Sequence, residues 1–253
     1  MTHRHRRILD ALTKNRKVEV AALAEMFSVS QVTIRKDLDT LEEQGLVRRE
    51  HGYACIDLSN GVNTCMAYNY NIKKRIALRA ASTVTDGETV LIESDSICAL
   101  LAEELVKTKK DVTIVTNSIF IANHIRSIPN GKIILLGGVF EKESQVTVGP
   151  MTCKCGEIFF SDKFFIGVDG FSESFGFTGR DHLRAETIQN LSGQAKDIIV
   201  LIESEKFSTA GVVGLVRTDK VAAVYTDDEI PLRIESYLHK NDVEIQKVSR
   251  RAE

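Results

Sequence analysis

The chain has 253 residues, of which 43% are hydrophobic and 27% are charged, and its formal net charge is −2. This length suits one large domain, or a domain of ordinary size with a small one, and we favour the second division. The net charge excludes a uniformly basic coat for nucleic acid but allows a local basic surface. The N-terminus provides one, because the first 17 residues hold six Arg or Lys residues and one Asp.

The sequence lacks a membrane span and a secretory signal, and its cysteines are not arranged for disulfides, so we expect the protein in a reducing compartment. No apolar run approaches the roughly 20 residues that span a bilayer, and the start MTHRHRRILDAL lacks the apolar centre of a secretory signal, so we expect a cytoplasmic protein. The five cysteines are scattered and odd in number, which argues against a disulfide framework. Cys153 and Cys155 lack the second pair or nearby histidine of a zinc site. We therefore expect two ordinary thiols there, with no metal and no cofactor.

Three helices are predicted at the N-terminus. HRHRRILDALTKN and VEVAALAEMFSVS each place apolar residues at helical spacing. A third helix is predicted over residues 30–44, with Ser30 as its N-cap, apolar residues at i, i+4 and i+7 from Ile34, and Gly45 at its C-terminal end. LVRRE, the HG turn and YACI then form a short hairpin signal.

Three helices followed by a hairpin predict a winged helix-turn-helix. The apolar face of the third helix packs on the first two, and its other face is free to enter a major groove, where it can contact base edges and phosphates. The residues expected to contact DNA are Ser30, Gln31, Thr33, Arg35 and Lys36 on the helix, and Arg48, Arg49 and His51 in the wing. A plainer interpretation makes Arg35, Lys36, Asp37 and Asp39 a solvated face with local ion pairs. The short second helix, the turn, the wing and the basic start together favour DNA binding.

The same stretch carries a family signature. VTIRKDLDTLEEQGLVRREHGYA resembles the DeoR family of bacterial sugar-catabolism repressors, whose pattern runs through T-I-R-x-D-L, L-E, G and R-x-H-G-G-A. The match spans the whole predicted DNA-binding head. Tyr53 stands where the family usually has a second Gly, so we expect a stiffer or differently aimed wing tip here.

The rest of the chain predicts a second, larger domain. Residues 1–57 form the DNA-binding domain, residues 58–72 read as a linker rich in Asn, Ser and Gly, and residues 73–253 form an α/β domain. In that domain the apolar runs ETVLIES, VTIVTN, KIILLGG, KFFIGVDG, DIIVLIES and KVAAVYTD alternate with helical stretches such as ICALLAEELVK and SIFIANHIRSI. This rhythm predicts a largely parallel sheet, whose ligands bind beyond the C-terminal ends of the strands.

Polar residues at those strand ends are the candidates for binding a small effector. They are Glu93, Ser94, Asp95, Ser96, Thr116, Asn117, Ser118, Gly137, Gly138, Asp169 and Lys206. TNS, LLGG, FIGVDG, GFT and the segment ending in KF resemble, in order, the effector domain of DeoR-type repressors, which is similar in fold to ribose-5-phosphate isomerase. The resemblance implies a sensor that binds a phosphorylated sugar and changes the affinity of the DNA-binding domain.

The chain departs from that pattern at the predicted effector site. Glu93-Ser94-Asp95-Ser96-Ile97 replaces the usual D-S-G-T-T, and Glu203-Ser204-Glu205-Lys206 replaces D-x-S-K, so the site is more acidic. Asp95 should repel a phosphate dianion unless it points away to cap the following helix or a cation intervenes. The sequence therefore leaves three alternatives to a phosphorylated sugar: an effector without a phosphate, a cationic effector, or a sensor that has lost its response to a ligand.

Individual residues of the sensor also have plainer interpretations. Lys206 follows two glutamates and reads equally as a ligand contact or as an exposed ion-pair partner. The pair Gly137 and Gly138 is commonly a strand-end turn. Asn117 is the stronger candidate, because a Thr-Asn-Ser cluster at a strand end gathers amide and hydroxyl groups.

Two function classes follow from the sequence. The favoured one is a ligand-responsive DNA-binding repressor that is not an enzyme and acts on double-stranded operator DNA as a homo-oligomer, a dimer or tetramer, because half-site spacing matches protein symmetry. The alternative is an isomerase-like enzyme of sugar phosphates with a DNA-binding arm. Nothing in the spacing of the acidic residues singles out a catalytic pair, and saturable turnover of sugar phosphates would favour the enzyme.

Overall fold

The computed structural model describes residues 2–15, 17–43, 46–56, 65–66 and 68–250. The chain divides into two compact units, Met1–Asn71 and Ile72–Glu253. Each unit has its own hydrophobic core, so each is described by itself. Gly45 and most of the segment predicted as a linker lie outside the described residues.

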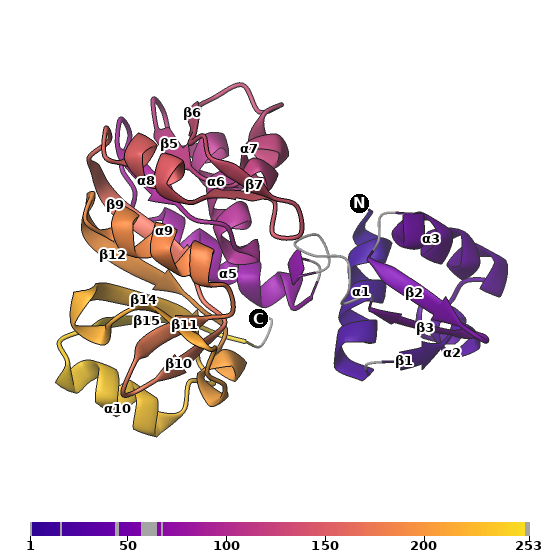
Figure 1. The fold of residues 1–253 in the computed structure, drawn as a ribbon. Helices are drawn as coiled ribbons and strands as arrows, with labels where there is room; N and C mark the ends of the chain where they lie inside the picture. The colour runs from indigo at the N-terminus through magenta and orange to yellow at the C-terminus, as the bar shows by residue number, and fades with distance from the viewer. Residues whose placement is uncertain (1, 16, 44–45, 57–64, 67, 251–253) are drawn as a thin grey trace. The chain divides into compact units, whose positions relative to one another are not determined.

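The first unit is a winged helix-turn-helix (Figure 1). Its elements are α1 (His3–Asn15), β1 (Lys17–Glu19), α2 (Val20–Met26), α3 (Gln31–Glu43), β2 (Val47–Glu50) and β3 (Tyr53–Ile56). The three strands form an antiparallel sheet in the order β1-β3-β2. Ile8, Leu12, Leu23, Ile34 and Leu38 are buried in the core between the helices, so the apolar faces were predicted correctly.

One boundary in this unit differs from the prediction. The second helix begins at Val20, and the preceding residues form β1, where Val18 pairs with Ala54 of the wing. Val18 is buried while its two neighbours are exposed, which is the alternation of a half-buried strand. VEV was therefore wrongly joined to the helix, because a three-residue strand is too short for its period to show in the sequence.

The second unit is an α/β domain around a parallel sheet. Seven strands lie in the order β15-β14-β12-β9-β4-β5-β6, and every neighbouring pair is parallel. They are β4 (Thr89–Ile92), β5 (Thr113–Thr116), β6 (Lys132–Leu135), β9 (Ser161–Gly167), β12 (Ala195–Leu201), β14 (Val221–Asp227) and β15 (Glu244–Val248). All six predicted apolar runs are strands of this sheet. The edge strand β15 was not predicted, because EIQKV is mostly polar.

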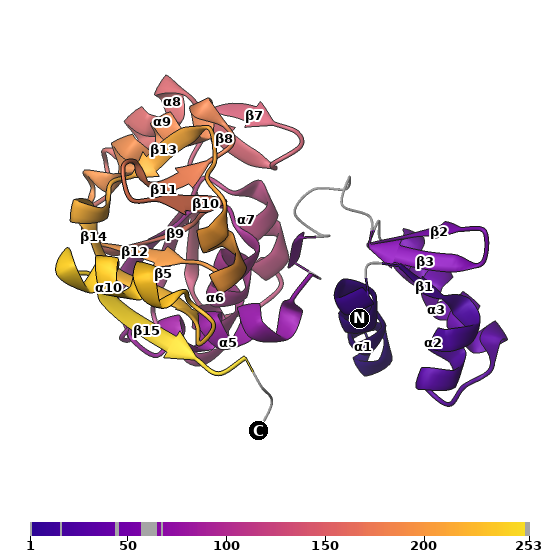
Figure 2. The same cartoon turned by 90° about the horizontal axis from the view of Figure 1, so that it is seen from below.

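Helices cover both faces of the sheet (Figures 1 and 2). On one face lie α5 (Tyr70–Ala81), α6 (Ser96–Thr108) and α7 (Ile119–Ile125). On the other lie α8 (Pro150–Gly156) and α9 (His182–Ser192), with a small antiparallel sheet of β10 (Gly170–Ser172), β11 (Gly176–Gly179) and β13 (Val213–Val216). The remaining elements are β7 (Val139–Glu141), β8 (Val146–Val148), α10 (Leu232–Lys240) and the short helical turns Ser204–Ser208 and Thr218–Lys220.

The topology brings distant parts of the chain to one edge of the sheet. Because β4, β5, β6, β9 and β12 are parallel neighbours, the segments that follow them meet at their C-terminal ends. Since α5 begins at Tyr70, the last three residues of the predicted linker are helical, and Lys73 in the first turn is buried.

Candidate DNA interface and effector site

The start of α3 is fixed by a local cap. The Thr33 N–H donates to Ser30 Oγ at 3.2 Å, and the Ser30 and Thr33 hydroxyls lie 2.9 Å apart. Ser30 was predicted as this cap, which satisfies one of the free N–H groups of the first turn. The hydroxyls of Ser30 and Thr33 therefore already have a partner in each other.

The outer face of α3 carries the residues available to DNA. Gln31, Arg35 and Lys36 are exposed, whereas Ile34 and Leu38 on the inner face are buried. Neither Arg35 nor Lys36 makes an ion pair with any residue that the structure describes. Two uncompensated cations and an amide on one exposed helix face match what phosphate and base-edge contacts require.

Asp37 does not belong to that exposed face. It is only 6% exposed and accepts hydrogen bonds from Arg4 Nε at 2.5 Å and Arg4 Nη2 at 2.9 Å, with His5 Nε2 at 3.1 Å. Burial opposes ionisation of this carboxyl, but the Arg4 and His5 contacts outweigh burial and lower its pKa. The solvated-face interpretation is thus wrong at Asp37, because this side chain joins α3 to α1. Arg4, one of the cations of the basic N-terminus, is used in this contact.

The wing is held to α3 by its own arginine. Arg49 Nε donates to Glu42 Oε2 at 2.8 Å and Arg49 Nη1 lies 2.6 Å from Asp39 Oδ1. Arg48 Nη2 lies 2.6 Å from Glu50 Oε1, with its side chain more than half exposed. The turn between β2 and β3 has positive φ at His51 (43°) and Gly52 (85°), the backbone that a two-residue hairpin turn requires. Arg48, Arg49 and His51, the three predicted wing contacts, are therefore all exposed, and Arg49 also joins the wing to α3.

In the second unit, seven charged side chains gather beyond the strand ends, and we call them the strand-end cluster. They are Lys73, Glu93, Asp95, Asp169, Arg184, Glu203 and Lys206. Four of them were predicted as effector-site residues. The structure brings them together from α5, α9 and the segments after β4, β9 and β12.

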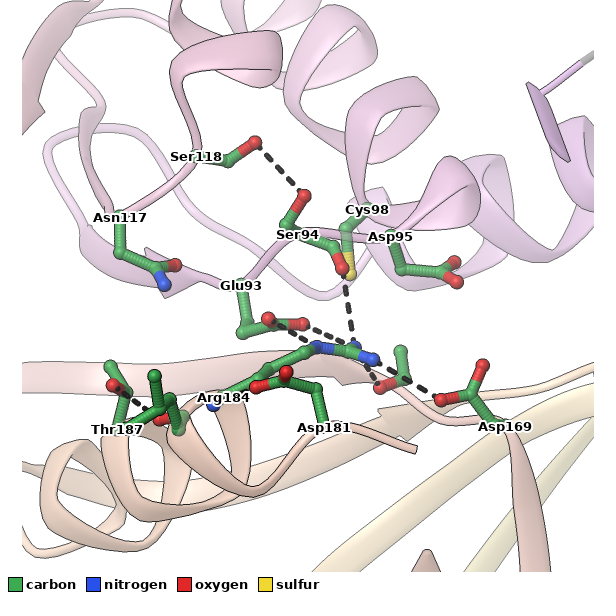
Figure 3. Close-up of polar contacts among 12 residues, drawn as sticks. Glu93, Ser94, Asp95, Cys98, Asn117, Ser118, Asp169, Asp181, Arg184 and Thr187 are labelled. Carbon is green, nitrogen blue, oxygen red and sulfur yellow. Dashed lines mark hydrogen bonds and ion pairs between the residues drawn. The ribbon is translucent and has the colours of Figure 1, made fainter. Parts of the chain in front are cut away.

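Arg184 is the centre of the cluster (Figure 3). It reaches from α9 to Glu93, with Nε 2.7 Å from Oε1 and Nη2 2.7 Å from Oε2, and it also donates to the Gly167 carbonyl at 2.9 Å and the Ser94 carbonyl at 3.2 Å. Asp169 Oδ2 lies 3.4 Å from Arg184 Nη1. Glu93 is 0% exposed, and burial raises its pKa against the opposing effect of Arg184.

Asp95 points away from Glu93 and caps α6 (Figure 3). Its Oδ1 accepts a hydrogen bond from the Ile97 N–H at 2.7 Å, and its Oδ2 lies 3.7 Å from Lys206 Nζ. Both partners considered for Asp95 from the sequence, the start of α6 and a cation, are present, and its carboxylate occupies both of them. Burial opposes the charge of Asp95, but Lys206 and Lys73 outweigh burial and lower its pKa.

Lys206 joins Asp95 to a buried glutamate. Its Nζ donates to the Val168 carbonyl at 2.9 Å and lies 3.3 Å from Glu203 Oε2, while Lys73 Nζ lies 3.4 Å from Glu203 Oε1. The Lys206 side chain is 23% exposed and Glu203 only 1%. Burial lowers the pKa of Lys206, but Asp95 and Glu203 outweigh it and raise that pKa. Lys206 is therefore a partly buried member of the cluster; it is an ion-pair partner, as the plainer interpretation held, but it is not exposed.

The other predicted effector residues lie along the same edge. Ser118 Oγ donates to Ser94 Oγ at 3.1 Å and caps α7 by accepting from the Ile121 N–H at 3.1 Å. The Thr116 hydroxyl accepts from the Ser118 N–H at 3.0 Å, and the Asn117 amide donates to the Thr147 carbonyl at 3.0 Å. These contacts fix the β4 and β5 loops to each other.

Two predicted residues, Ser96 and Gly138, have packing roles, and Gly137 does not. Ser96 is the buried first residue of α6. Gly138 approaches Thr152 so closely that a Cβ would lie 1.9 Å from Thr152 Oγ1, and a Cβ on Gly137 would meet open space. At Gly138 the strand-end turn is thus also a close approach to α8.

Three cluster members were not among the predicted effector residues: Lys73, Arg184 and Glu203, of which Glu203 was noted only as part of an acidic segment. Arg184 follows the helix cap Asp181, whose Oδ1 accepts from the Arg184 N–H at 2.7 Å, and it is the last residue of an ordinary D-H-L-R helix start. Lys73 lies at the boundary of the predicted linker. The sequence contains one signal, an excess of acidic residues at the strand ends. Buried carboxylates require nearby cations, but this excess does not identify which Arg or Lys residues supply them.

Besides the strand-end cluster, the described part of the chain has a cavity but no candidate metal site or membrane span. No group of three or more His, Cys, Asp or Glu residues there could hold a metal ion, and no described helix is long and apolar enough to cross a membrane. A cavity of about 620 Å³ lies between α9, β12 and β13, lined by Phe175, Gln189, Leu215 and Arg217 among others. It lies away from the strand-end cluster and contains none of the predicted effector residues.

Comparison with protein families shows the family to which the chain belongs. Residues 4–59 match the model of the DeoR-like helix-turn-helix domain, and residues 68–228 match the DeoR C-terminal sensor domain. The chain belongs to the DeoR family. Its first unit is the DNA-binding domain of a transcriptional regulator, and its second unit is the sensor domain.

Curated relatives are similar along nearly their whole length. The glycerol-3-phosphate regulon repressor of Escherichia coli is 28% identical over 97% of this chain and 98% of its own. The HTH-type transcriptional regulator GolR of Listeria innocua is 26% identical over 90% of this chain and 91% of its own.

Among solved structures, ribose 5-phosphate isomerase A of Methanocaldococcus jannaschii matches 55% of this chain and 55% of its own at 16% identity. The TM-score of 0.41 is too low to inform function.

Proposed function

We propose that this DeoR-family protein represses an operon for the catabolism of a sugar or sugar alcohol. The DNA-binding domain binds double-stranded operator DNA through the outer face of α3 and through the wing. The sensor domain binds a small sugar-derived effector at the strand-end cluster and thereby changes operator affinity. Relatives whose names include a regulon repressor and an aga operon repressor support this class of function.

The observation that carries the proposal is the division of α3 into two faces. Ile34, Leu38 and the Asp37 contact hold one face on α1, so the helix is rigidly placed. The opposite face exposes Arg35 and Lys36 without internal ion-pair partners among the described residues. A fixed helix with free cations and an amide is suited to a major groove.

The alternative of a sugar-phosphate isomerase gains nothing from the cluster. An acid–base mechanism needs a carboxyl or imidazole free to exchange a proton with the substrate. Glu93 is bound on both oxygens by Arg184, and Asp95 is bound to the α6 N-terminus and lies beside Lys206. The family relatives are regulators, so the cluster is interpreted as a binding site.

Selection of duplexes from a random library by the full chain tests DNA binding. We expect enriched sites with an inverted repeat, because a homo-oligomer with two-fold symmetry presents two copies of α3. A variant with alanine at Gln31, Thr33, Arg35 and Lys36 should no longer shift these sites in a gel. Shifting by that variant as complete as by the wild type would show that α3 does not read the operator.

A further inference from the structure

Asp95 occupies the place in the sensor domain where an anionic group would be bound. The N-terminus of α6 and the ammonium of Lys206 are two elements that attract anions. Both are already in contact with the Asp95 carboxylate, at 2.7 Å from the Ile97 nitrogen to Oδ1 and 3.7 Å from Lys206 Nζ to Oδ2. The chain thus supplies its own anion to this site.

The backbone is shaped to hold Asp95 in this position. A Cβ on Gly167 would lie 2.0 Å from the Asp95 Cβ and 2.2 Å from its Cγ, so only glycine leaves room for the aspartate at the end of β9. The Asp95 side chain is 14% exposed. An incoming phosphate would have to displace a side chain that is both packed and hydrogen bonded.

The charges of the cluster also disfavour a phosphate. The cluster has four carboxylates and three cations, so one negative charge is in excess. Arg184 is shared between Glu93 and Asp169, and Lys206 between Asp95 and Glu203. A dianion would therefore compete with carboxylates already in place for each of these two cations.

Two buried residues that follow β5 and β12 have acceptor atoms without a hydrogen bond to the described residues. Asn117 Oδ1 accepts no hydrogen bond from the residues that the structure describes. The two Glu203 oxygens face lysine ammoniums, with Oε1 3.4 Å from Lys73 Nζ and Oε2 3.3 Å from Lys206 Nζ. Buried acceptors call for donors. Hydroxyl groups of a sugar or polyol can donate to them, whereas a phosphate dianion has no proton to donate.

From these observations we infer that Asp95 determines the specificity of the sensor by excluding phosphate, and that the effector is a neutral, hydroxyl-rich molecule such as a free sugar or sugar alcohol. This inference rests on the proposed function, because it assumes that the strand-end cluster is the effector site. It specifies the chemical class that the cluster accepts.

Calorimetric titration with inorganic phosphate, at matched ionic strength, tests the role of Asp95 on the full chain. Asp95→Gly frees the α6 N-terminus and Lys206, so it should bind phosphate at least about tenfold more tightly than the wild type. Asp95→Gly/Lys206→Met should lose that gain, which separates this site from the basic surface of the DNA-binding domain. Asp95→Asn keeps an acceptor for the Ile97 N–H without the charge, and it should also bind more tightly than the wild type.

Two results would overturn the role of Asp95: phosphate binding by the wild type as tight as by Asp95→Gly, or no binding by either protein. If the glycine variant does not fold, the same comparison is made with Asp95→Asn, and equal affinity overturns the role. A thermal-shift screen of sugars and sugar alcohols, each beside its phosphate ester, tests the ligand class. We expect a stabilising hit among the unphosphorylated compounds. A phosphate ester that stabilises the wild type more than its parent compound, or a screen without any hit, contradicts the ligand class.

Gel shifts on the same preparations keep this inference separate from the proposed function. Asp95→Gly should still shift the selected operator, because Asp95 is in the sensor domain and the contacts to DNA are in the other unit. Phosphate binding by the wild type as tight as by Asp95→Gly, together with a normal operator shift, would defeat the inference alone. Failure of the wild type to shift any selected duplex would defeat the proposed function, whatever the phosphate titration shows.

Discussion

Removing the Arg184 guanidinium should destabilise the sensor domain strongly. Arg184 donates to both oxygens of Glu93 and to two backbone carbonyls, and Glu93 is fully buried. Arg184→Met would leave a buried carboxylate without its cation. Breaking a buried ion pair in this way costs about 3–5 kcal/mol of unfolding free energy.

The cost should depend on pH with a defined sign. Burial already raises the pKa of Glu93 in the wild type, and loss of Arg184 should raise it further. A carboxyl with a raised pKa in the folded state binds more protons folded than unfolded, so its effect on stability becomes less favourable as pH rises between the unfolded and folded pKa values. The defect of Arg184→Met should therefore be largest near pH 8 and shrink toward pH 5.

Urea unfolding of the full chain at pH 5 and pH 8, followed by circular dichroism, measures the unfolding free energy of the sensor domain. The matched control is Glu93→Met/Arg184→Met, which removes both charges and replaces them with apolar side chains. It should recover most of the lost stability, since a buried ion pair can often be replaced in this way at little cost. A loss below about 1 kcal/mol for Arg184→Met at pH 8, or a double variant as unstable as the single one, would refute the reasoning.

Three smaller changes test other parts of the structure. Asp37→Asn should lower the unfolding free energy of the DNA-binding domain by about 1–3 kcal/mol, because α3 loses charge-assisted bonds to α1; unchanged melting would show that the contact is dispensable. A hydrogen bond from His124 lowers the pKa of Glu103 to about 2 against the effect of burial, so Glu103 stabilises the fold above its unfolded pKa and this contribution is lost as pH falls toward 2. Glu103→Gln should accordingly show a smaller loss of stability than the wild type in an acid titration from pH 5 to pH 2, and identical curves would contradict this. Gly52→Ala should destabilise the wing by about 1 kcal/mol in thermal melts because Gly52 has a φ of 85°, whereas Gly137→Ala, which meets open space, should be neutral; equal effects would show that backbone conformation is not the cause.

The sequence was sufficient for elements with strong periodicity or a clear cap. The faces of α3, the cap at Ser30 and the six apolar strands were all predicted, because each depends on residues close in the chain. β1 and β15 were missed, since a three-residue strand has no readable period and an edge strand of polar residues lacks an apolar run.

The site was predicted only in part, because its contacts are long-range. Glu93, Asp95 and Asp169 each follow a parallel strand, so their positions in the sequence predicted that they lie at the same end of the sheet. The sequence could not show that Arg184 comes from a helix 91 residues further along the chain than Glu93. Asp37 was misjudged for the same reason, since its partner Arg4 is 33 residues away.

The most direct test of the central claim is the salt dependence of operator binding, measured by fluorescence anisotropy on a selected duplex. The wild type is compared with Arg35→Ala/Lys36→Ala and with Lys109→Ala/Lys110→Ala, which removes the same charge from the sensor domain. We predict that the α3 variant binds more weakly and that its slope of log affinity against log salt falls by about 1 for each lost phosphate contact, while the control matches the wild type. An α3 variant with the affinity and salt slope of the wild type would contradict the claim that this helix binds the operator.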